Sequence, residues 1–246
     1  MEYFMHTTGT IPKGHGFKHF DTTHLCWLAL FLALAVLLCV AYRRWGETGR
    51  RRFRYVMAAL IVADEIFKIV FLVIGGRYTI NYLPLHLCSI NIVLIAVHAI
   101  RPSKTLDNFL YTIGLPTAVM ALLFPTWTKL PFLNFSHLHS FTVHILLALY
   151  PLVLTVGGDI RPRARYIGKC LLLLVCLAAP VYVFNCLFDT NFMFLMSADK
   201  GNPLYWFGKN WGSHLWGYPV LGSAVLAVMY LPVELYHALR ARRAHA

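Results

Sequence analysis

The sequence predicts an all-α protein, a polytopic membrane helix bundle with seven transmembrane helices. Hydrophobic residues make up 59% of its 246 residues and charged residues only 13%, whereas soluble domains carry roughly 25% charged residues. Apolar runs that are long enough to cross a bilayer, about 17 to 25 residues, recur seven times along the chain. They leave no room for a soluble domain. We therefore expect one transmembrane domain over 24–237, an external N-terminal tail over 1–23 and a basic cytoplasmic tail over 238–246.

Each expected span is a stretch of apolar residues of spanning length. The second contains three ionisable residues near its middle, the third and fifth begin with polar residues, and polar residues follow the sixth. Six spans, with the histidine-rich start of the chain lying on the membrane surface, is the alternative arrangement. In chain order the seven expected spans are 24–42, 55–75, 83–100, 108–124, 139–156, 169–188 and 213–236.

Basic residues predict the orientation, because Lys and Arg accumulate in short cytoplasmic loops. One set of alternate loops, with the C-terminal tail, holds fifteen Lys and Arg residues, and the opposite set holds six. This asymmetry places the N-terminus outside and the C-terminus in the cytoplasm. The net charge of +12 is therefore a topology signal that also favours anionic lipid headgroups. We do not expect nucleic-acid binding.

Three ionisable residues, Asp64, Glu65 and Lys68, interrupt the second span. A charged side chain at this depth costs at least about 2.5 kcal/mol, so such groups face a protein interior or a wet cavity. Lys68 lies four residues after Asp64 and three after Glu65, and so can neutralise one carboxylate on the same helix. The remaining negative charge needs a partner on another helix, or a proton. A structural ion pair and a functional site are both consistent with this cluster.

Polar residues of several spans are expected at one depth, in the outer third of the bundle. Cys88 lies about five residues below the start of the third span, and His144 lies at a similar depth in the fifth. Cys88 shares a helical face with Asn91, whereas His86 points away unless the first turn is irregular. Pro84 permits such a turn, because proline is tolerated at the start of a helix. Ser140 shares the face of His144, and His139 faces the other way.

Three chemical interpretations of this set stay open on the residues alone. A thiol beside an imidazole is an activated nucleophile, with Cys88 attacking an ester and His144 or His86 acting as base and acid. Histidines of the tail and of the third and fifth spans could instead bind a metal, since His-x-His is a ligand pattern. Alternatively, the polar groups hydrogen-bond between helices, which is common in membranes. The cysteines form no Cys-x-x-Cys pair, and we assign no cofactor and no metal.

Four segments carry a resemblance to a known family. They are Leu-Pro-Leu-His-Leu-Cys-Ser-Ile at 83–90, Leu-Phe-Pro at 123–125, His-Ser-Phe-x-x-His at 139–144 and Thr-Asn-Phe-Met-Phe-Leu at 190–195. Over about residues 20–236 the chain resembles the YwaF-like bacterial conserved hypothetical integral membrane proteins. It is more distantly similar to the animal transmembrane cysteine acyltransferase that remodels ether phospholipids. The first resemblance implies a multi-pass protein of the bacterial inner membrane.

The animal resemblance implies roles for particular residues. The animal pattern at the start of the third span is Pro-Cys-His, where this chain reads Pro84, Leu85 and His86. Leu85 thus occupies the nucleophile position, and Cys88, one helical turn further, would stand in for it. His86 matches the pattern, and so does His144, which precedes Pro151 by seven residues.

We therefore expect a lipid-binding polar pocket in the outer-leaflet half, with membrane phospholipids as partners. The catalytic residues of a phospholipid acyltransferase or transacylase would be Cys88, His144 and His86. A non-enzymatic transporter or sensor coupled to the cluster in the second span is the alternative function. The residues expected to bind the substrate are Asn91, Ser140, His139, Asn185, Asp189, Asn191, Glu65, Lys68 and His214.

Overall fold

The structure is a computed structural model that describes residues 3–12, 14–198, 200 and 202–244, with side chains as far as residue 235. Helices carry the fold throughout this part of the chain, and it contains no strand. The predicted all-α class is therefore confirmed.

Each expected span has a helical counterpart. The helix α8 was not predicted, and the fourth span is broken into α4 and α5 by a π-helical turn at Leu110–Gly114. The helices are α1 (Thr22–Arg44), α2 (Glu47–Ile74), α3 (Leu87–Ile100), α4 (Lys104–Phe109), α5 (Leu115–Leu123), α6 (Phe135–Val156), α7 (Ile167–Phe188), α8 (Pro203–Trp211) and α9 (Gly217–Ala244). Short 3₁₀ turns lie at Ile80–Tyr82, Ala164–Tyr166, Phe192–Phe194 and His214–Trp216.

Five helical segments among the described residues are long and apolar enough to cross a membrane. They are Thr22–Arg44, Lys104–Leu123, Phe135–Val156, Ala164–Phe188 and His214–Leu235. The helix α2 is longer than any of these but contains the three charged residues of the second span. The helix α3 has 14 residues, about 21 Å at 1.5 Å per residue, against about 30 Å of hydrocarbon. A multi-pass protein follows from these helices, and seven spans with the expected orientation stay a prediction.

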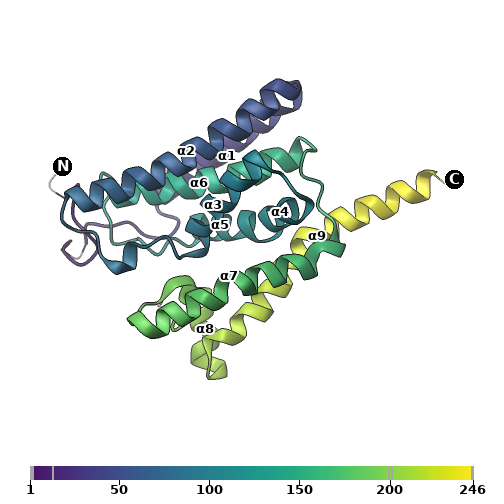
Figure 1. Ribbon diagram of the computed structural model, residues 1–246. Coiled ribbons are helices and arrows are strands. Elements are labelled where there is room, and N and C mark those ends of the chain that lie inside the picture. The colour runs from purple at the N-terminus through teal and green to yellow at the C-terminus, as the bar shows by residue number, and fades with distance from the viewer. Residues whose placement is uncertain (1–2, 13, 199, 201, 245–246) are drawn as a thin grey trace.

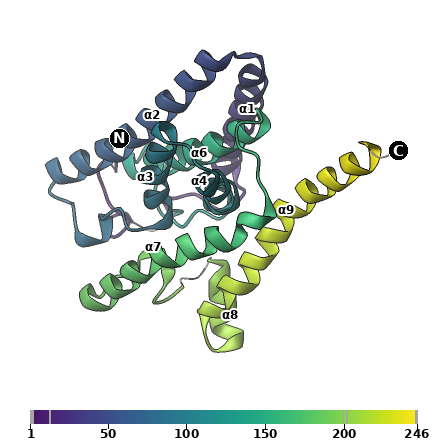
Figure 2. The same cartoon turned by 45° about the vertical axis from the view of Figure 1, so that its right-hand side comes forward.

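The helices form two groups (Figures 1 and 2). In the first, α6 lies at the centre and packs against α1, α2, α3 and α5. Phe141, Ala148, Tyr150 and Val153 of α6 are completely buried there. The second group contains α7, α8 and α9, and α7 joins it to the first through contacts with α4. The last turns of α9 extend away from both groups.

The helices of the second group expose many apolar side chains. Leu172 of α7 is 65% exposed, and Leu231 of α9 is 70% exposed. A soluble protein rarely shows continuous apolar surfaces of this extent. These faces fit a hydrocarbon environment, as the composition of the chain predicts.

The N-terminal tail folds over the connection between α5 and α6. The Phe17 backbone N–H donates to the Thr128 carbonyl at 2.9 Å, and the Asn134 amide donates to the Tyr3 carbonyl at 2.7 Å. Asp21 caps α1 and accepts the Lys18 and His24 backbone N–H groups. These two hydrogen bonds favour the carboxylate and lower the pKa of Asp21 from its ordinary value.

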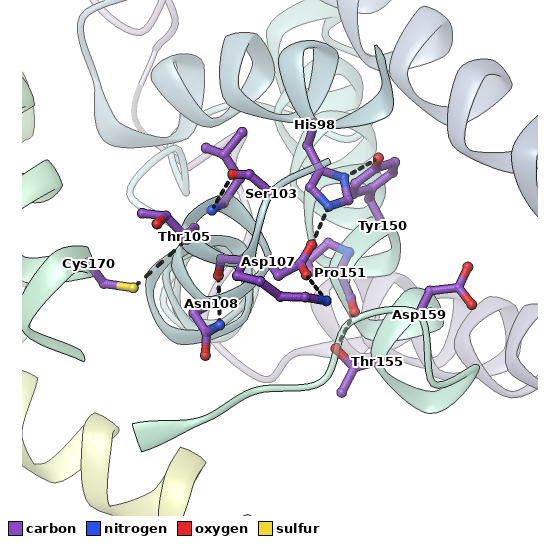
Figure 3. A network of polar contacts seen from close by, with 12 residues as sticks. His98, Ser103, Thr105, Asp107, Asn108, Tyr150, Pro151, Thr155, Asp159 and Cys170 are labelled. Carbon is purple, nitrogen blue, oxygen red and sulfur yellow. Dashed lines mark hydrogen bonds and ion pairs between the residues drawn. The ribbon is translucent and has the colours of Figure 1, made fainter. Parts of the chain in front are cut away.

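A buried polar network ties three helices together at the opposite end of the first group (Figure 3). His98 of α3 donates from Nε2 to Asp107 of α4 at 2.8 Å, and its Nδ1 accepts from the Tyr150 hydroxyl of α6 at 2.8 Å. Lys104 lies 3.3 Å from the other carboxylate oxygen of Asp107. A carboxylate can only accept, so the two bonds of His98 fix its neutral tautomer.

Candidate functional site

Cys88 is the second residue of α3, two positions after the helix cap His86. Its side chain is half-buried and packs against the main hydrophobic core. Leu85, at the position of the animal nucleophile, packs instead in the apolar cluster that contains Val181 and Phe192. The thiol at the start of α3 is therefore that of Cys88.

His144 of α6 is held in one tautomer. Its Nδ1 lies 2.6 Å from the Ser140 backbone carbonyl. Because a carbonyl only accepts, Nδ1 carries the hydrogen and Nε2 retains a lone pair when the ring is neutral. The ring also stacks on Trp127, with centroids 5.2 Å apart and planes at 14°. His144 is therefore oriented as a base that uses Nε2.

His86 has the opposite tautomer. Its Nδ1 accepts the Met193 backbone N–H at 3.2 Å, which leaves the hydrogen of the neutral ring on Nε2. The rings of Phe192 and Phe194 lie 5.1 and 5.9 Å from it. The connection between α7 and α8 therefore fixes the imidazole at the start of α3 as a donor.

Side chains of that connection form most of their hydrogen bonds within it. Asn185 is buried, accepts from Thr190 and from the Phe192 backbone, and donates to the Phe192 carbonyl. Asn191 bonds Ser197 and the backbone around it. These expected substrate-binding residues thus support the loop that holds His86.

Two further expected substrate-binding residues border the same loop. His214 contacts the Phe194 carbonyl at 3.0 Å through Nε2. Asp189 ends α7 in a left-handed conformation with φ of 49° and is exposed. The Asp189 carboxylate is therefore accessible to solvent or to lipid headgroups.

Asn91 and Trp127 carry buried polar atoms without a partner among the described residues. Asn91 is 1% exposed, and neither its amide nitrogen nor its oxygen is hydrogen-bonded. The indole N–H of Trp127, which stacks on His144, is also buried and unpartnered. Buried polar groups are normally hydrogen-bonded, so both sites have capacity for water or for polar groups of a substrate.

The charged residues of α2 meet His139 of α6. Lys68 Nζ lies 2.5 Å from Glu65 Oε1, and His139 Nδ1 lies 2.9 Å from Asp64 Oδ2. His139 Nε2 is 3.8 Å from Glu65 Oε2. The approach of His139 to Asp64 lacks hydrogen-bond alignment, so we treat it as an electrostatic contact. His139 is the partner on another helix that the surplus carboxylate required.

In the structure, three of the predicted histidines form separate contacts and do not meet at one site. His144 contacts Ser140, His139 contacts the acidic residues of α2, and His86 contacts the loop after α7. Cys88 forms no hydrogen bond with His86 or His144 in the described part of the chain. The helices that carry Cys88 and His144, α3 and α6, pack directly against each other. Groups of three or more His, Cys, Asp or Glu side chains that could hold one metal ion are not found among the described residues.

Sequence reasoning missed Trp127 and the partners of His98. Trp127 lies two residues after the Leu-Phe-Pro segment, and an aromatic residue close to a family-like segment was the available signal. For His98, the signal was a second histidine on the face of Cys88 and Asn91, followed nine residues later by Asp107. Neither signal shows which residues touch in the folded protein.

Residues 19–230 match the model of the TMEM164 family. The chain belongs to the TMEM164 family. The match agrees with the animal resemblance and does not support the YwaF-like label. Curated proteins and solved structures give no match. The match covers the whole of α1 to α7 and every residue of the candidate site, which makes this a TMEM164-family membrane protein.

Proposed function

We propose that this TMEM164-family protein transfers fatty acyl groups between phospholipids, with Cys88 as nucleophile. The tautomer of His144 carries the proposal, because the Ser140 carbonyl holds the hydrogen on Nδ1 and leaves Nε2 available as a base. Nucleophilic catalysis needs a thiol within reach of a base, and the packing of α3 against α6 puts Cys88 and His144 on neighbouring helices. Family membership supports the same chemistry.

The reaction has two balanced half-reactions. His144 Nε2 takes the Cys88 proton, and the thiolate attacks the ester carbonyl of a donor phospholipid. The tetrahedral intermediate expels the glycerol oxygen, which receives the proton from His144, and a lysophospholipid leaves. The hydroxyl of a second lysophospholipid then gives its proton to His144 and attacks the thioester. The new ester forms, the carbon–sulfur bond breaks and Cys88 recovers its proton.

The other predicted residues have supporting roles in this proposal. His86, with its hydrogen on Nε2, is a donor for the oxyanion, and donors aimed at developing charge are strong contributors to catalysis. Asn91 and Ser140 lie on the faces of α3 and α6 that carry Cys88 and His144. The Glu65–Lys68 pair with His139 would form the polar floor of the lipid site, and Asp189 would face the headgroups.

Acyl transfer by reconstituted protein tests the proposal. Vesicles would contain a phospholipid with a radiolabelled acyl chain and an unlabelled lysophospholipid acceptor. We expect Cys88→Ala to reduce transfer to background and His144→Ala to reduce it by about 10²–10⁴-fold. Cys26→Ala is the matched control, because Cys26 is an exposed thiol on α1. Transfer at the wild-type rate by Cys88→Ala protein would exclude Cys88 as the nucleophile.

A transporter or sensor without covalent chemistry is the second candidate function. The contact between His139 and Asp64 favours it, because ionisable pairs inside membranes mark proton and ion pathways. In proteoliposomes, proton flux that is lost in Glu65→Gln protein but retained in Cys88→Ala protein would support this candidate. The reverse dependence would favour the acyltransferase.

A further inference from the structure

A cavity of about 770 Å³ lies at the end of the first helix group where α2 and α4 begin and α3 and α6 end. Its volume is in the range of small-molecule sites. It is separate from the start of α3, where Cys88 lies, and from the charged residues in the middle of α2. Its walls combine apolar residues such as Trp45 and Leu154 with basic and acidic side chains.

Two of the three basic residues at this cavity are already paired. Arg50 donates to Asp159 at 2.8 Å, to the Gly157 carbonyl and to the Trp45 carbonyl. Asp159 also accepts from the Tyr42 hydroxyl at 2.5 Å. These contacts neutralise both charges and fix this wall of the cavity.

The second pair lies in the network of Figure 3. Lys104 lies 3.3 Å from Asp107, whose other oxygen accepts from His98. The side chain of Lys104 is 65% exposed, so it lies at the rim. The carboxylate of Asp107 is thus fully engaged and is not available for another cation.

Arg54 is the cation that stays uncompensated. It lines the cavity four residues after Arg50, on the same face of α2. Its Nε is buried and has no acceptor, and no carboxylate in the described part of the chain lies within ion-pair distance of it. The Arg54 side chain as a whole is half-buried, and a buried N–H group without an acceptor is costly. The planar fork of the guanidinium matches the geometry of phosphate and carboxylate oxygens.

We propose that this cavity binds a phosphodiester, the group at the centre of a phospholipid headgroup, on Arg54. Arg54 forms no ion pair in the described part of the chain, and one guanidinium suits the single negative charge of a phosphodiester. Glu47, an exposed carboxylate at the cavity, disfavours the second charge of a phosphomonoester. The positive-inside distribution places this site in the cytoplasmic leaflet.

Binding of soluble short-chain lipids to the full-length protein in detergent tests the proposal without any acyl transfer. The probes are dihexanoylphosphatidylglycerol, dihexanoylglycerol, which lacks the phosphate, and inorganic phosphate, each measured by calorimetry. We expect saturable binding of dihexanoylphosphatidylglycerol and no binding of dihexanoylglycerol. Arg54→Gln should weaken binding by about tenfold or more, the equivalent of one charge-assisted contact.

Arg51→Gln is the matched control, since it removes the same charge from an exposed position of the same helix. The affinity of the Arg51→Gln protein for dihexanoylphosphatidylglycerol should stay within about twofold of the wild-type value, because exposed charges contribute little. An equal loss in both variants would show general surface attraction and overturn the proposal. Inorganic phosphate that binds as tightly as the lipid would identify free phosphate as the source and overturn the headgroup assignment.

Arg54→Lys keeps the proposal testable if Arg54→Gln does not fold. This variant retains the charge but loses the planar fork, and we expect a several-fold weaker affinity for dihexanoylphosphatidylglycerol. Unchanged affinity in Arg54→Lys, or in a folded Arg54→Gln, would overturn the role of Arg54.

Discussion

His139 links α6 to the acidic residues of α2. It approaches Asp64 and Glu65 on α2, while Lys68 pairs with Glu65 on the same helix. The side chains of Lys68 and Glu65 are only 13% and 10% exposed. Removal of either member would leave a buried charge without its nearest partner. The cluster therefore contributes to the packing of α2 on α6 whatever its functional role.

Lys68→Met measures that contribution. The variant removes the nearest partner of the buried Glu65 carboxylate, which should destabilise the protein by about 3–5 kcal/mol. Chemical unfolding in detergent measures the change in free energy. Lys104→Met is the control, because Lys104 is 65% exposed and Asp107 keeps its contact with His98; we expect a loss of about 1 kcal/mol or less. The double variant Glu65→Leu, Lys68→Met should recover most of the loss, and equal small effects in both single variants would contradict the account.

The connection between α7 and α8 is the element that positions His86. Met193 and Phe194 have positive φ angles of 56° and 55°, which non-glycine residues adopt only under constraint. The constraint comes from Asn185, which forms three hydrogen bonds to Thr190 and Phe192. His86 depends on this loop through the Met193 backbone N–H.

Asn185→Ala should loosen the connection. Three groups lose their partner, and each buried unsatisfied group costs about 1–3 kcal/mol. We expect lower stability and faster cleavage of residues 190–198 by a protease in detergent. Asn210→Ala removes one exposed hydrogen bond to the Trp206 carbonyl, and the protease should cleave this variant at the wild-type rate. Equal cleavage rates in the two variants would show that Asn185 does not hold the loop.

Hydropathy predicted most of the helices of the whole molecule, but not all of them. Apolar runs identify α1, α6 and α7 to within a few residues, because length and composition alone determine them. The same signal overestimated α3, which begins at Leu87 and not at 83. The residues before it form a 3₁₀ turn and a Pro84 segment that hydropathy cannot distinguish from helix. The helix α8 was missed because it is short and lies between polar residues.

The candidate site was less predictable, because residue type does not reveal which partner a polar side chain meets. The surplus charge on α2 could be deduced from spacing, but His139 as its partner required the fold. Asn91 and Asn185 look alike in the sequence. In the structure, Asn185 is fully hydrogen-bonded and Asn91 has no partner among the described residues. Contacts over long sequence separations decide such differences.

The orientation of the bundle is testable by accessibility. Single cysteines replace Thr7 in the N-terminal tail and Ser103 before α4, in a protein without other cysteines. Positive-inside asymmetry predicts that a membrane-impermeant maleimide labels the Thr7→Cys variant in intact cells. The Ser103→Cys variant should be labelled only after permeabilisation. The opposite pattern would reverse the topology and place the Arg54 cavity in the outer leaflet.

Detection of an acyl group on Cys88 tests directly whether Cys88 is the nucleophile. Intact-protein mass spectrometry would follow the purified protein after incubation with a donor phospholipid in the absence of an acceptor. The account predicts a mass increase of one acyl chain that neutral hydroxylamine removes, present in wild-type and Cys26→Ala protein and absent from Cys88→Ala protein. An adduct that persists in Cys88→Ala protein, or turnover without any adduct, would contradict it.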